Sequence, residues 1–322
     1  MTKAPGQSHR AGINLKQLME MFATDDKARE WLESELWPDG PYCPHCGSFN
    51  VQCNIKHRSM THRCRDCPKR PQFSLKTGTV MKGTKLKYRD WAIAIYLLTT
   101  NLKGISSMKL HRDLEITQKS AWHLLHRLRT AFETSNPVFS GPVEADETYM
   151  GGKEKNKHAK KKLKAGRGVV GKTAVSGVRD RNTGQVVAKV VERTNAETLQ
   201  GFVTDHTVEG AQVYTDETSA YKRIDRRHEA VNHSVGEYVR EQAHTNGLES
   251  FWAPMKRGVD GVYHKMSPKH LQRYVDEFSG RHNNRPKDTN KQMSSLVAGM
   301  EGKRLRYADL IADNGLNSGA RS

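Results

Sequence analysis

Long apolar segments are absent from this chain of 322 residues. The longest uninterrupted apolar run, Trp91 to Leu98, is eight residues long, whereas a helix that spans a membrane needs about 20. Residues 1–10 are polar and lack the apolar core of a secretory signal peptide. These absences exclude a protein built on membrane-spanning helices, and they predict a cytoplasmic protein.

Cysteine is also scarce, with five residues in the whole chain. In a reducing compartment, cysteines bind metal more often than they form disulfides. Aromatic residues make up 7% of the chain and hydrophobic residues 35%, which is low but sufficient for globular domains. The length is enough for two or three such domains, each with its own core.

Acidic residues are few compared with basic ones. Asp and Glu number 35 against 53 Lys and Arg, which leaves a net charge of +18 and a pI near 9.7. A surplus of this size destabilises a compact chain through self-repulsion unless a polyanion neutralises it. Nucleic acid is the commonest such partner, because its phosphates release counterions when basic side chains bind. Ribosomal and membrane-surface proteins are basic too, so charge alone leaves the class open.

Four of the five cysteines form two Cys-x-x-Cys pairs, and the segment 47–63 separates the pairs. Each pair can place two thiolates on one tight turn, and two facing turns complete a tetrahedral zinc site. The sequence therefore predicts a zinc ribbon with strands near 51–54, 60–63 and 72–75. The predicted zinc ligands are Cys43, Cys46, Cys64 and Cys67.

Two roles stay open for this ribbon. Zinc can serve only to make so small a segment foldable. Alternatively, the ribbon contacts DNA through its basic side chains, which are Lys56, His57, Arg58, His62, Arg63 and Arg65. We expect His45, His57 and His62 to be solvated, although each is an alternative ligand, and we expect Cys53 to be packed in the hairpin. Two helices, at 15–22 and from Asp25 to before Pro38, are predicted to brace the ribbon.

Helical periodicity dominates the sequence between 88 and 132. Apolar spacing predicts helices at 91–102, 105–114 and 118–132, the last with Thr117 as its N-cap. The short turn at 115–117 fits a helix-turn-helix, in which the second helix enters the major groove of DNA. The outer face of that helix is then basic, with Lys119, His123, His126, Arg127 and Arg129. The alternative is a three-helix linker whose charged face is only solvated.

The pattern changes to alternating strands and helices after Pro142. Strands are predicted at 143–149, 173–178, 186–191, 211–216 and near 228–231, with a helix at 196–208 and further helices at 246–256 and 268–283. Three strands, a helix, a strand and C-terminal helices is the order expected of a ribonuclease-H-like α/β fold. Between the first two strands, residues 153–172 carry nine Lys or Arg against one Glu, which favours either DNA contact or a solvated loop.

Three acidic positions are candidates for chemistry in this region. Asp146 lies in the first strand, Asp216 ends the fourth strand, and Glu249 follows in the first of the C-terminal helices. Glu144 and Glu147 are alternatives to Asp146, and strand alternation puts Glu144 and Asp146 on one face with Glu147 on the other. An ordinary turn residue is the alternative for Asp216.

A set of short motifs follows the same order along the chain. They are Cys-Pro-x-Cys-Gly-Ser from Cys43, Phe73-Ser74 with Thr77-Gly78-Thr79, Glu144-x-Asp146-Glu147-x-Tyr149-x-Gly-Gly, Thr215-Asp216, His244-Thr245-Asn246 with Glu249, Phe251-Trp252 and Lys256-Arg257-Gly258, then Tyr263-His264 and His270-Leu271. In this order the motifs resemble those of DDE-type insertion-sequence transposases with an N-terminal zinc ribbon, the ISXO2-like family. No single motif is decisive, but their order is specific, and the resemblance spans about residues 43–285.

The resemblance implies an enzyme that cuts DNA at the ends of its element and joins the freed 3′-OH to target DNA. It implies that Asp146 and Asp216 are ligands of two Mg²⁺ ions about 3.5–4 Å apart. The third ligand stays open between Glu249 and Asn246, which are three residues apart and can share one side of a helix. Alternatively, these two residues form only a capping box.

Lys256 is the fifth candidate site residue. It follows Glu249 by seven residues, or about two helical turns, as expected of a basic residue that contacts a DNA phosphate. Pro254 lies between them and is expected to interrupt the helix.

The predicted organisation is N-terminal helices at 1–40, a zinc ribbon at 41–80, a helix-turn-helix-like DNA-binding segment at 86–136, a ribonuclease-H-like core at 140–287 and a C-terminal tail at 288–322. DNA is the expected partner, as element end and as target, in association with the nucleoid, and no membrane partner is expected. Synapsis of two ends predicts a homo-oligomer. Two alternatives remain: a ribonuclease-H-like nuclease that hydrolyses without joining, and a catalytically inactive zinc-ribbon DNA-binding regulator.

Overall fold

The computed structural model describes residues 12–133, 137–152, 169–216, 218–231 and 245–316. The chain divides into two compact units. The first unit combines the residues up to Glu133 with Asn284–Ala312, and the second runs from Thr134 to Asn283, with the residues from 313 onward. Within the described residues, no helix combines the length and the apolar character needed to cross a membrane.

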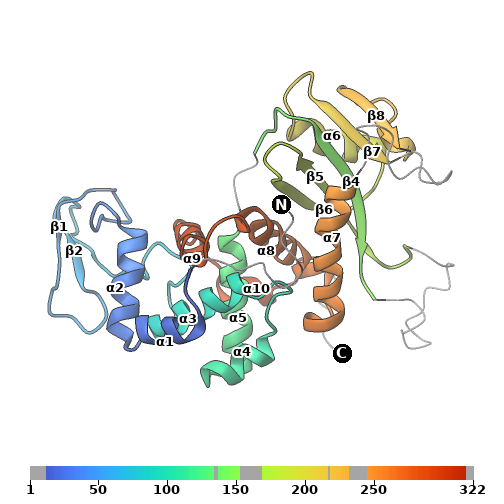
Figure 1. Ribbon diagram of the computed structural model, residues 1–322. Coiled ribbons are helices and arrows are strands. Elements are labelled where there is room, and N and C mark those ends of the chain that lie inside the picture. The colour runs from blue at the N-terminus through green and yellow to red at the C-terminus, as the bar shows by residue number, and fades with distance from the viewer. Residues whose placement is uncertain (1–11, 134–136, 153–168, 217, 232–244, 317–322) are drawn as a thin grey trace. The chain divides into compact units, whose positions relative to one another are not determined.

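The first unit contains helices and one small sheet (Figure 1). The sheet has the strand order β1-β2-β3, and both strand pairs are antiparallel. The elements of this unit are α1 (Leu15–Met21), α2 (Asp25–Leu36), β1 (Val51–Gln52), β2 (His62–Cys64), β3 (Gln72–Phe73), α3 (Tyr88–Thr100), α4 (Ser107–Leu114), α5 (Gln118–Ala131), α9 (Thr289–Ala298) and α10 (Tyr307–Ile311).

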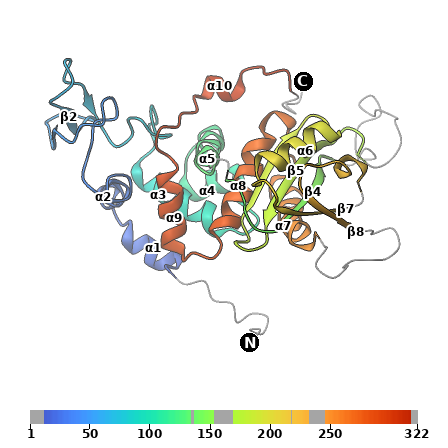
Figure 2. The same cartoon turned by 90° about the horizontal axis from the view of Figure 1, so that it is seen from above.

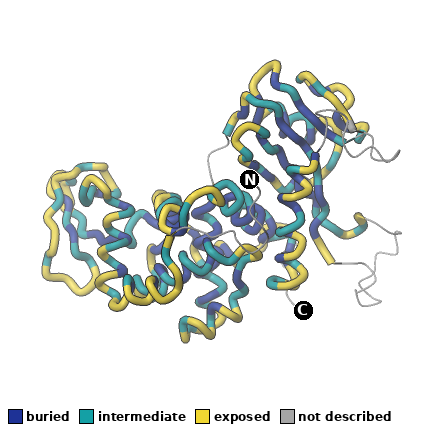
Figure 3. The backbone as a smooth tube through the Cα atoms, in the orientation of Figure 1, coloured by how far each residue is buried: buried dark blue, intermediate teal, exposed yellow. Residues whose placement is uncertain are grey.

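Apolar residues at helical spacing build the core of the first unit. Trp91, Ile95 and Leu98 on α3 are fully buried in a cluster that also contains Leu32 of α2 and Leu296 of α9. Figure 3 shows the resulting alternation of buried and exposed positions along these helices. The residues 288–313, in which the sequence shows only weak helical signals, thus contain a core helix that packs against α3.

The helices α4 and α5 and the turn between them have the predicted local structure. The hydroxyl of Thr117 accepts a hydrogen bond from the backbone N–H of Ser120 at 3.1 Å, which caps α5 as expected. Glu115 ends α4 in the left-handed conformation, with φ of 53°, and so turns the chain sharply between the two helices.

The predicted basic outer face of α5 is wrong for most of its length. His126, Arg127 and Arg129 are buried, with exposed fractions of 0%, 8% and 1%. The segment before α10 covers part of this face, because the backbone carbonyl of Leu305 accepts a hydrogen bond from Arg127 at 3.1 Å. Of the five predicted side chains, only Lys119 is exposed, and its ammonium lies 4.3 Å from the centre of the Tyr307 ring.

The second unit contains a five-stranded sheet with helices on both faces (Figure 2). Its strand order is β6-β5-β4-β7-β8; β5 is antiparallel to both of its neighbours, and β7 is parallel to β4 and β8. The elements are β4 (Val143–Met150), β5 (Thr173–Asp180), β6 (Val186–Val191), α6 (Ala196–Asp205), β7 (Gln212–Asp216), η3 (Ser219–Tyr221), β8 (Arg227–Val231), α7 (Asn246–Gly258), η5 (Val259–Tyr263), η6 (Pro268–His270) and α8 (Leu271–Asn284).

Two apolar clusters hold this sheet between its helices. Val175 and Val186 pack with α7 and α8 on one face. Val143, Ala145 and Val213 pack with α6 and η3 on the other face. Because successive side chains of a strand alternate between the faces, Glu144 and Asp146 lie on the α7 face and Glu147 lies on the α6 face. The predicted division of these three acids is confirmed.

The expected interruption at Pro254 is wrong, because α7 continues through it to Gly258. Proline removes one backbone hydrogen bond from a helix. The apolar face of α7 offsets that loss, since Leu248, Phe251 and Met255 are buried in the cluster that α7 shares with α8 and the sheet. Glu249 and Lys256 therefore belong to one helix.

Candidate functional site

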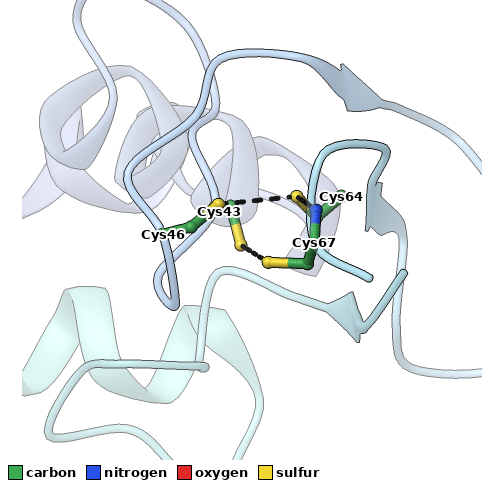
Figure 4. Close-up of side chains that lie close together, drawn as sticks. All are labelled: Cys43, Cys46, Cys64 and Cys67. Carbon is green, nitrogen blue, oxygen red and sulfur yellow. Dashed lines mark hydrogen bonds between the residues drawn. The ribbon is translucent and has the colours of Figure 1, made fainter. Parts of the chain in front are cut away.

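The four predicted zinc ligands come together in the first unit (Figure 4). Their sulfur atoms all lie within 4.8 Å of one another, and the Sγ–Sγ distances are 3.9 Å for Cys43–Cys67 and 3.7 Å for Cys46–Cys64. Ligands about 2.3 Å from a tetrahedral Zn²⁺ are about 3.8 Å apart. Backbone N–H groups of His45 and Cys67 point at two of the sulfurs, as thiolates require. The cluster therefore fits a structural Zn²⁺ ion.

Two side chains of the ribbon differ from their predicted surroundings. His62 is 6% exposed instead of solvated, because its ring is stacked on Phe73 and meets the edge of Trp37. Cys53 was expected to be packed but is exposed. Cys53 is exposed because β1 ends at Gln52, so the cysteine lies outside the sheet, whereas His62 lies inside β2.

A cavity of about 430 Å³ lies beside the zinc cluster, within the first unit. Its lining includes the basic residues Lys82, Lys303 and Arg304. Its one acidic lining residue, Glu301, accepts a hydrogen bond from the hydroxyl of Tyr42. The guanidinium of Arg127 donates to the carbonyl of the lining residue Lys82 and to that of Leu305, which follows the lining residue Arg304. This part of the unit is therefore positively charged.

Asp146 and Asp216 lie on neighbouring strands of the second unit. Strands β4 and β7 run parallel, with Val143 opposite Val213 and Glu144 opposite Tyr214. Asp146 and Asp216 are separated in the sequence by the same offset as these two register pairs. Asp146 and Asp216 therefore lie two positions beyond the last paired residues, on strands that are neighbours in the sheet.

The surroundings of Asp146 are buried and negatively charged. Its carboxylate accepts a hydrogen bond of 2.9 Å from the indole N–H of Trp252 on α7. Burial, together with the negative charges of Asp216 and Glu249, raises the pKa of Asp146 to about 6 despite this hydrogen bond. The other two predicted acids, Asp216 and Glu249, therefore both lie within electrostatic range of Asp146.

Glu147 is a fourth carboxylate next to these acids. It accepts a hydrogen bond of 2.8 Å from the hydroxyl of Tyr221 in η3. Burial, with the charges of Asp216 and Asp146, raises the pKa of Glu147 to about 7 despite that bond. Sequence reasoning treated Glu147 only as an alternative to Asp146; its place directly after Asp146 in the strand was the available signal.

The three candidates on α7 differ in their surroundings. Glu249, Asn246 and Lys256 are all exposed. Glu249 acts on Asp146 through its charge, whereas no interaction of Asn246 or Lys256 with the acids is seen in the described part of the chain. Thr245, not Asn246, is the N-cap of α7, and its side chain makes no capping bond, so the capping box is not formed.

Glu144 has a structural role that the sequence did not indicate. It is fully buried, and its carboxylate is 3.3 Å from the guanidinium of Arg179 and 3.0 Å from that of Arg181. It also accepts a hydrogen bond of 2.9 Å from the backbone N–H of Leu248 in the first turn of α7. Glu144 thus replaces the missing cap of the helix that carries Glu249, and it is not free to bind a cation.

The possible ligand atoms of the acids lie farther apart than the four cysteine sulfurs do. Across the described residues, the cysteine cluster is the one group of three or more Cys, His, Asp or Glu whose ligand atoms lie within 4.8 Å of one another. Two further sequence features, the basic segment 153–168 and His244, lie outside the described residues.

Comparison with known proteins gives two family matches. Residues 138–283 match the ISXO2-like transposase domain, and residues 23–70 match the transposase zinc-ribbon domain. An uncharacterized protein in transposable element ISH50 of Halobacterium salinarum is 28% identical over 260 residues, which cover 75% of this chain and 87% of the relative. The first match contains the acids described above, and the second contains all four cysteines.

Proposed function

Because the chain belongs to the ISXO2-like transposases, we propose that it is a Mg²⁺-dependent DDE transposase, which cleaves DNA at the ends of its element and joins them to target DNA. The observation that carries this proposal is the placement of Asp146 and Asp216 on neighbouring parallel strands, with Asp216 and Glu249 both in electrostatic range of Asp146. Phosphoryl transfer needs such a group of oxygens on one site.

The donor set suits Mg²⁺. Carboxylate oxygens are the hard ligands that this ion prefers, and it needs only a few of them because it keeps several waters. Within the described residues, none of the three carboxylates forms an ion pair with Lys or Arg. The negative charge that raises the pKa of Asp146 is therefore left for a cation to neutralise.

We assign Asp146, Asp216 and Glu249 as the ligands. Glu249 is favoured over Asn246 as the third ligand because its charge acts on Asp146. When bound, two Mg²⁺ ions supply an activated hydroxyl nucleophile and stabilise the leaving oxygen. Lys256 lies about two turns further along α7, is exposed, and is assigned to a DNA phosphate.

We further propose that the second unit is a ribonuclease-H-like core. Three antiparallel strands joined to two parallel ones, with helices on both faces, support this assignment. DNA binding by the first unit is supported by its basic cavity and by the zinc ribbon. Because two element ends must be brought together, we expect the active form to be a homo-oligomer.

The test is an in vitro transposition assay. Labelled duplexes with the inverted repeats that flank the gene are incubated with a target plasmid and Mg²⁺. Asp146→Asn, Asp216→Asn and Glu249→Gln should each lower the rate more than about 100-fold, because metal-assisted charge stabilisation is worth several kcal/mol. The matched control is Glu197→Gln, which alters an exposed glutamate on α6 and should leave the rate unchanged.

The products separate the alternatives. Joined molecules support transposition, whereas cleaved ends without joining indicate a nuclease. No reaction with the unmodified protein, combined with tight binding of the ends, indicates a catalytically inactive regulator.

A further inference from the structure

We propose that Trp252 is a positioning residue for Asp146: its indole N–H holds the carboxylate from the α7 side in the orientation needed for metal binding. This inference rests on the proposed function, because it takes Asp146 to be a metal ligand. The hydrogen bond from Nε1 to Oδ2 is 2.9 Å long, and the indole that makes it is 2% exposed.

The sheet is built to admit this indole. Gly177 on β5 is the register partner of Asp146 on β4. A Cβ atom at Gly177 would lie 2.7 Å from Cζ2 of Trp252, closer than side chains approach each other. The indole thus lies directly against β5 at the level of Asp146, where any other residue at position 177 would displace it.

Packing holds the ring in this place. Trp252 belongs to the apolar cluster between the sheet and α8, and its ring centre is 4.8 Å from that of Phe251. Its N–H is the only polar group of the side chain, and it is a donor only. An apolar core position by itself needs no donor, so the N–H directed at a carboxylate indicates a role beyond packing.

The same helix carries both contributions to the site. Trp252 and Glu249 are three residues apart on α7, so they lie on neighbouring positions of one helical side. Packing of α7 against the sheet therefore places Glu249 near the site and also orients Asp146 through Trp252. Groups that hydrogen-bond to metal ligands in this way fix ligand orientation, and their loss typically lowers metal affinity about 10–100-fold.

The test uses Trp252→Phe in the zinc-loaded full-length chain. This variant keeps an aromatic ring and removes the N–H donor. Mn²⁺ serves as the probe, and its binding is followed by the electron paramagnetic resonance signal of the free ion. We expect the affinity for Mn²⁺ to fall about 10–100-fold. The rate of transposition should recover at saturating Mg²⁺, so that the metal requirement changes more than the maximal rate.

The matched control is Trp91→Phe. Trp91 is buried in the first unit, and its indole N–H has no hydrogen-bond partner among the described residues, so the same chemical change there should leave Mn²⁺ affinity unaltered. Gly177→Ala is the second test variant, because its added methyl group displaces the indole without changing Trp252. It keeps the test decisive if Trp252→Phe does not fold, as judged by circular dichroism.

The outcomes distinguish this inference from the proposed function. If folded Trp252→Phe or Gly177→Ala binds Mn²⁺ as tightly as the unmodified protein, the positioning role is overturned and the transposase proposal stands. If the unmodified protein binds no Mn²⁺, or if Asp146→Asn leaves binding unchanged, the proposed function fails and the role of Trp252 fails with it.

Discussion

Asp146 and Glu147 are adjacent in the chain but point to opposite faces of β4. Each accepts one hydrogen bond from an aromatic side chain, Trp252 for Asp146 and Tyr221 for Glu147. Each also has a raised pKa, for the shared reasons of burial and the charge of Asp216. These two carboxyl groups of the central strand therefore hold their protons to higher pH than free acids do when no cation is present.

Stabilisation by Mg²⁺ should depend on pH. Free Asp has a pKa near 3.9, and Asp146 has one of about 6 in the folded chain. The folded state thus binds the proton more tightly, and the stability this contributes is present at low pH and lost as pH rises through about 6. At pH 5 the carboxyl group of Asp146 is protonated, so a metal ion must displace the proton, whereas at pH 7.5 the group is already ionised. We expect Mg²⁺ to raise the Tm at pH 7.5 and to have little effect at pH 5, as measured by thermal unfolding.

Asp146→Asn should abolish this difference, and Glu197→Gln should preserve it. An equal rise in Tm at both pH values in the unmodified protein would contradict the assignment of Asp146 as a metal ligand.

At the scale of elements, α7 is held at its N-terminus by a strand instead of by its own cap. Glu144 on β4 accepts from the backbone of Leu248 and is paired with two arginines of the β5 region. A negative charge at a helix N-terminus is favourable because of the helix dipole. Arg181 also lies 4.0 Å from the centre of the Tyr214 ring on β7. One buried carboxylate thus links the elements that carry Asp146, Asp216 and Glu249.

Glu144→Gln should destabilise the second unit. Removing one partner of a buried ion pair leaves charge uncompensated, which typically costs about 3–5 kcal/mol. Glu192→Gln, at an exposed position, is the matched control and should cost little. Urea unfolding followed by circular dichroism measures both variants. An unchanged midpoint for Glu144→Gln would show that this network does not hold α7.

Gly247→Ala tests the same contact from the other side. A Cβ atom at position 247 would lie 2.3 Å from Nη1 of Arg179 and 2.6 Å from Oε2 of Glu144. We expect a loss of stability comparable to that of Glu144→Gln, and a double variant that loses less than the two losses combined, because both changes act on one network.

At the scale of the whole molecule, each unit has apolar clusters of its own. The zinc cluster is packed with Phe73 and Trp37 in the first unit, and both faces of the large sheet are covered within the second. The ribbon strands are only two or three residues long. So small a sheet depends on its metal for folding, whereas the second unit has no such need.

Chelation of zinc should therefore unfold the ribbon and spare the second unit. We expect Cys67→Ser to lose the single zinc ion and to become sensitive to proteolysis near residues 41–73, with cleavage sites identified by mass spectrometry. Cys53→Ser is the matched control: Cys53 is exposed and outside the cluster, so this variant should keep its zinc and its resistance. Loss of zinc from Cys53→Ser would contradict the ligand assignment.

The elements that the sequence predicted best are those with a strong local signal. The strand of Asp146, the cysteine pairs and the Thr117 cap all depend on near neighbours, through side-chain alternation, turn geometry and one hydrogen bond. The motif order indicated the transposase family for the same reason, because each motif is short and contiguous.

The predictions that failed concerned how elements pack. The basic face of α5 is buried because the segment around Leu305, which is distant in the sequence, lies on it. The helix α7 survives Pro254 because α8 and the sheet pack against it. Neither partner is visible in the local sequence, so charge pattern and helix-breaking propensity pointed to the wrong result.

The amino-acid sequence by itself determined which residue types are available for chemistry: four thiols at zinc-binding spacing, and acids on a strand, at a strand end and on a helix. Tertiary structure alone decided the surroundings of each acid, and those surroundings separate a structural acid from a candidate metal ligand. Glu144 and Asp146 share one strand face, yet two arginines and a helix terminus surround the first, while an indole and two further acids surround the second. Those neighbours come from strands and helices distant in sequence, and only folding brings their charges close enough to act.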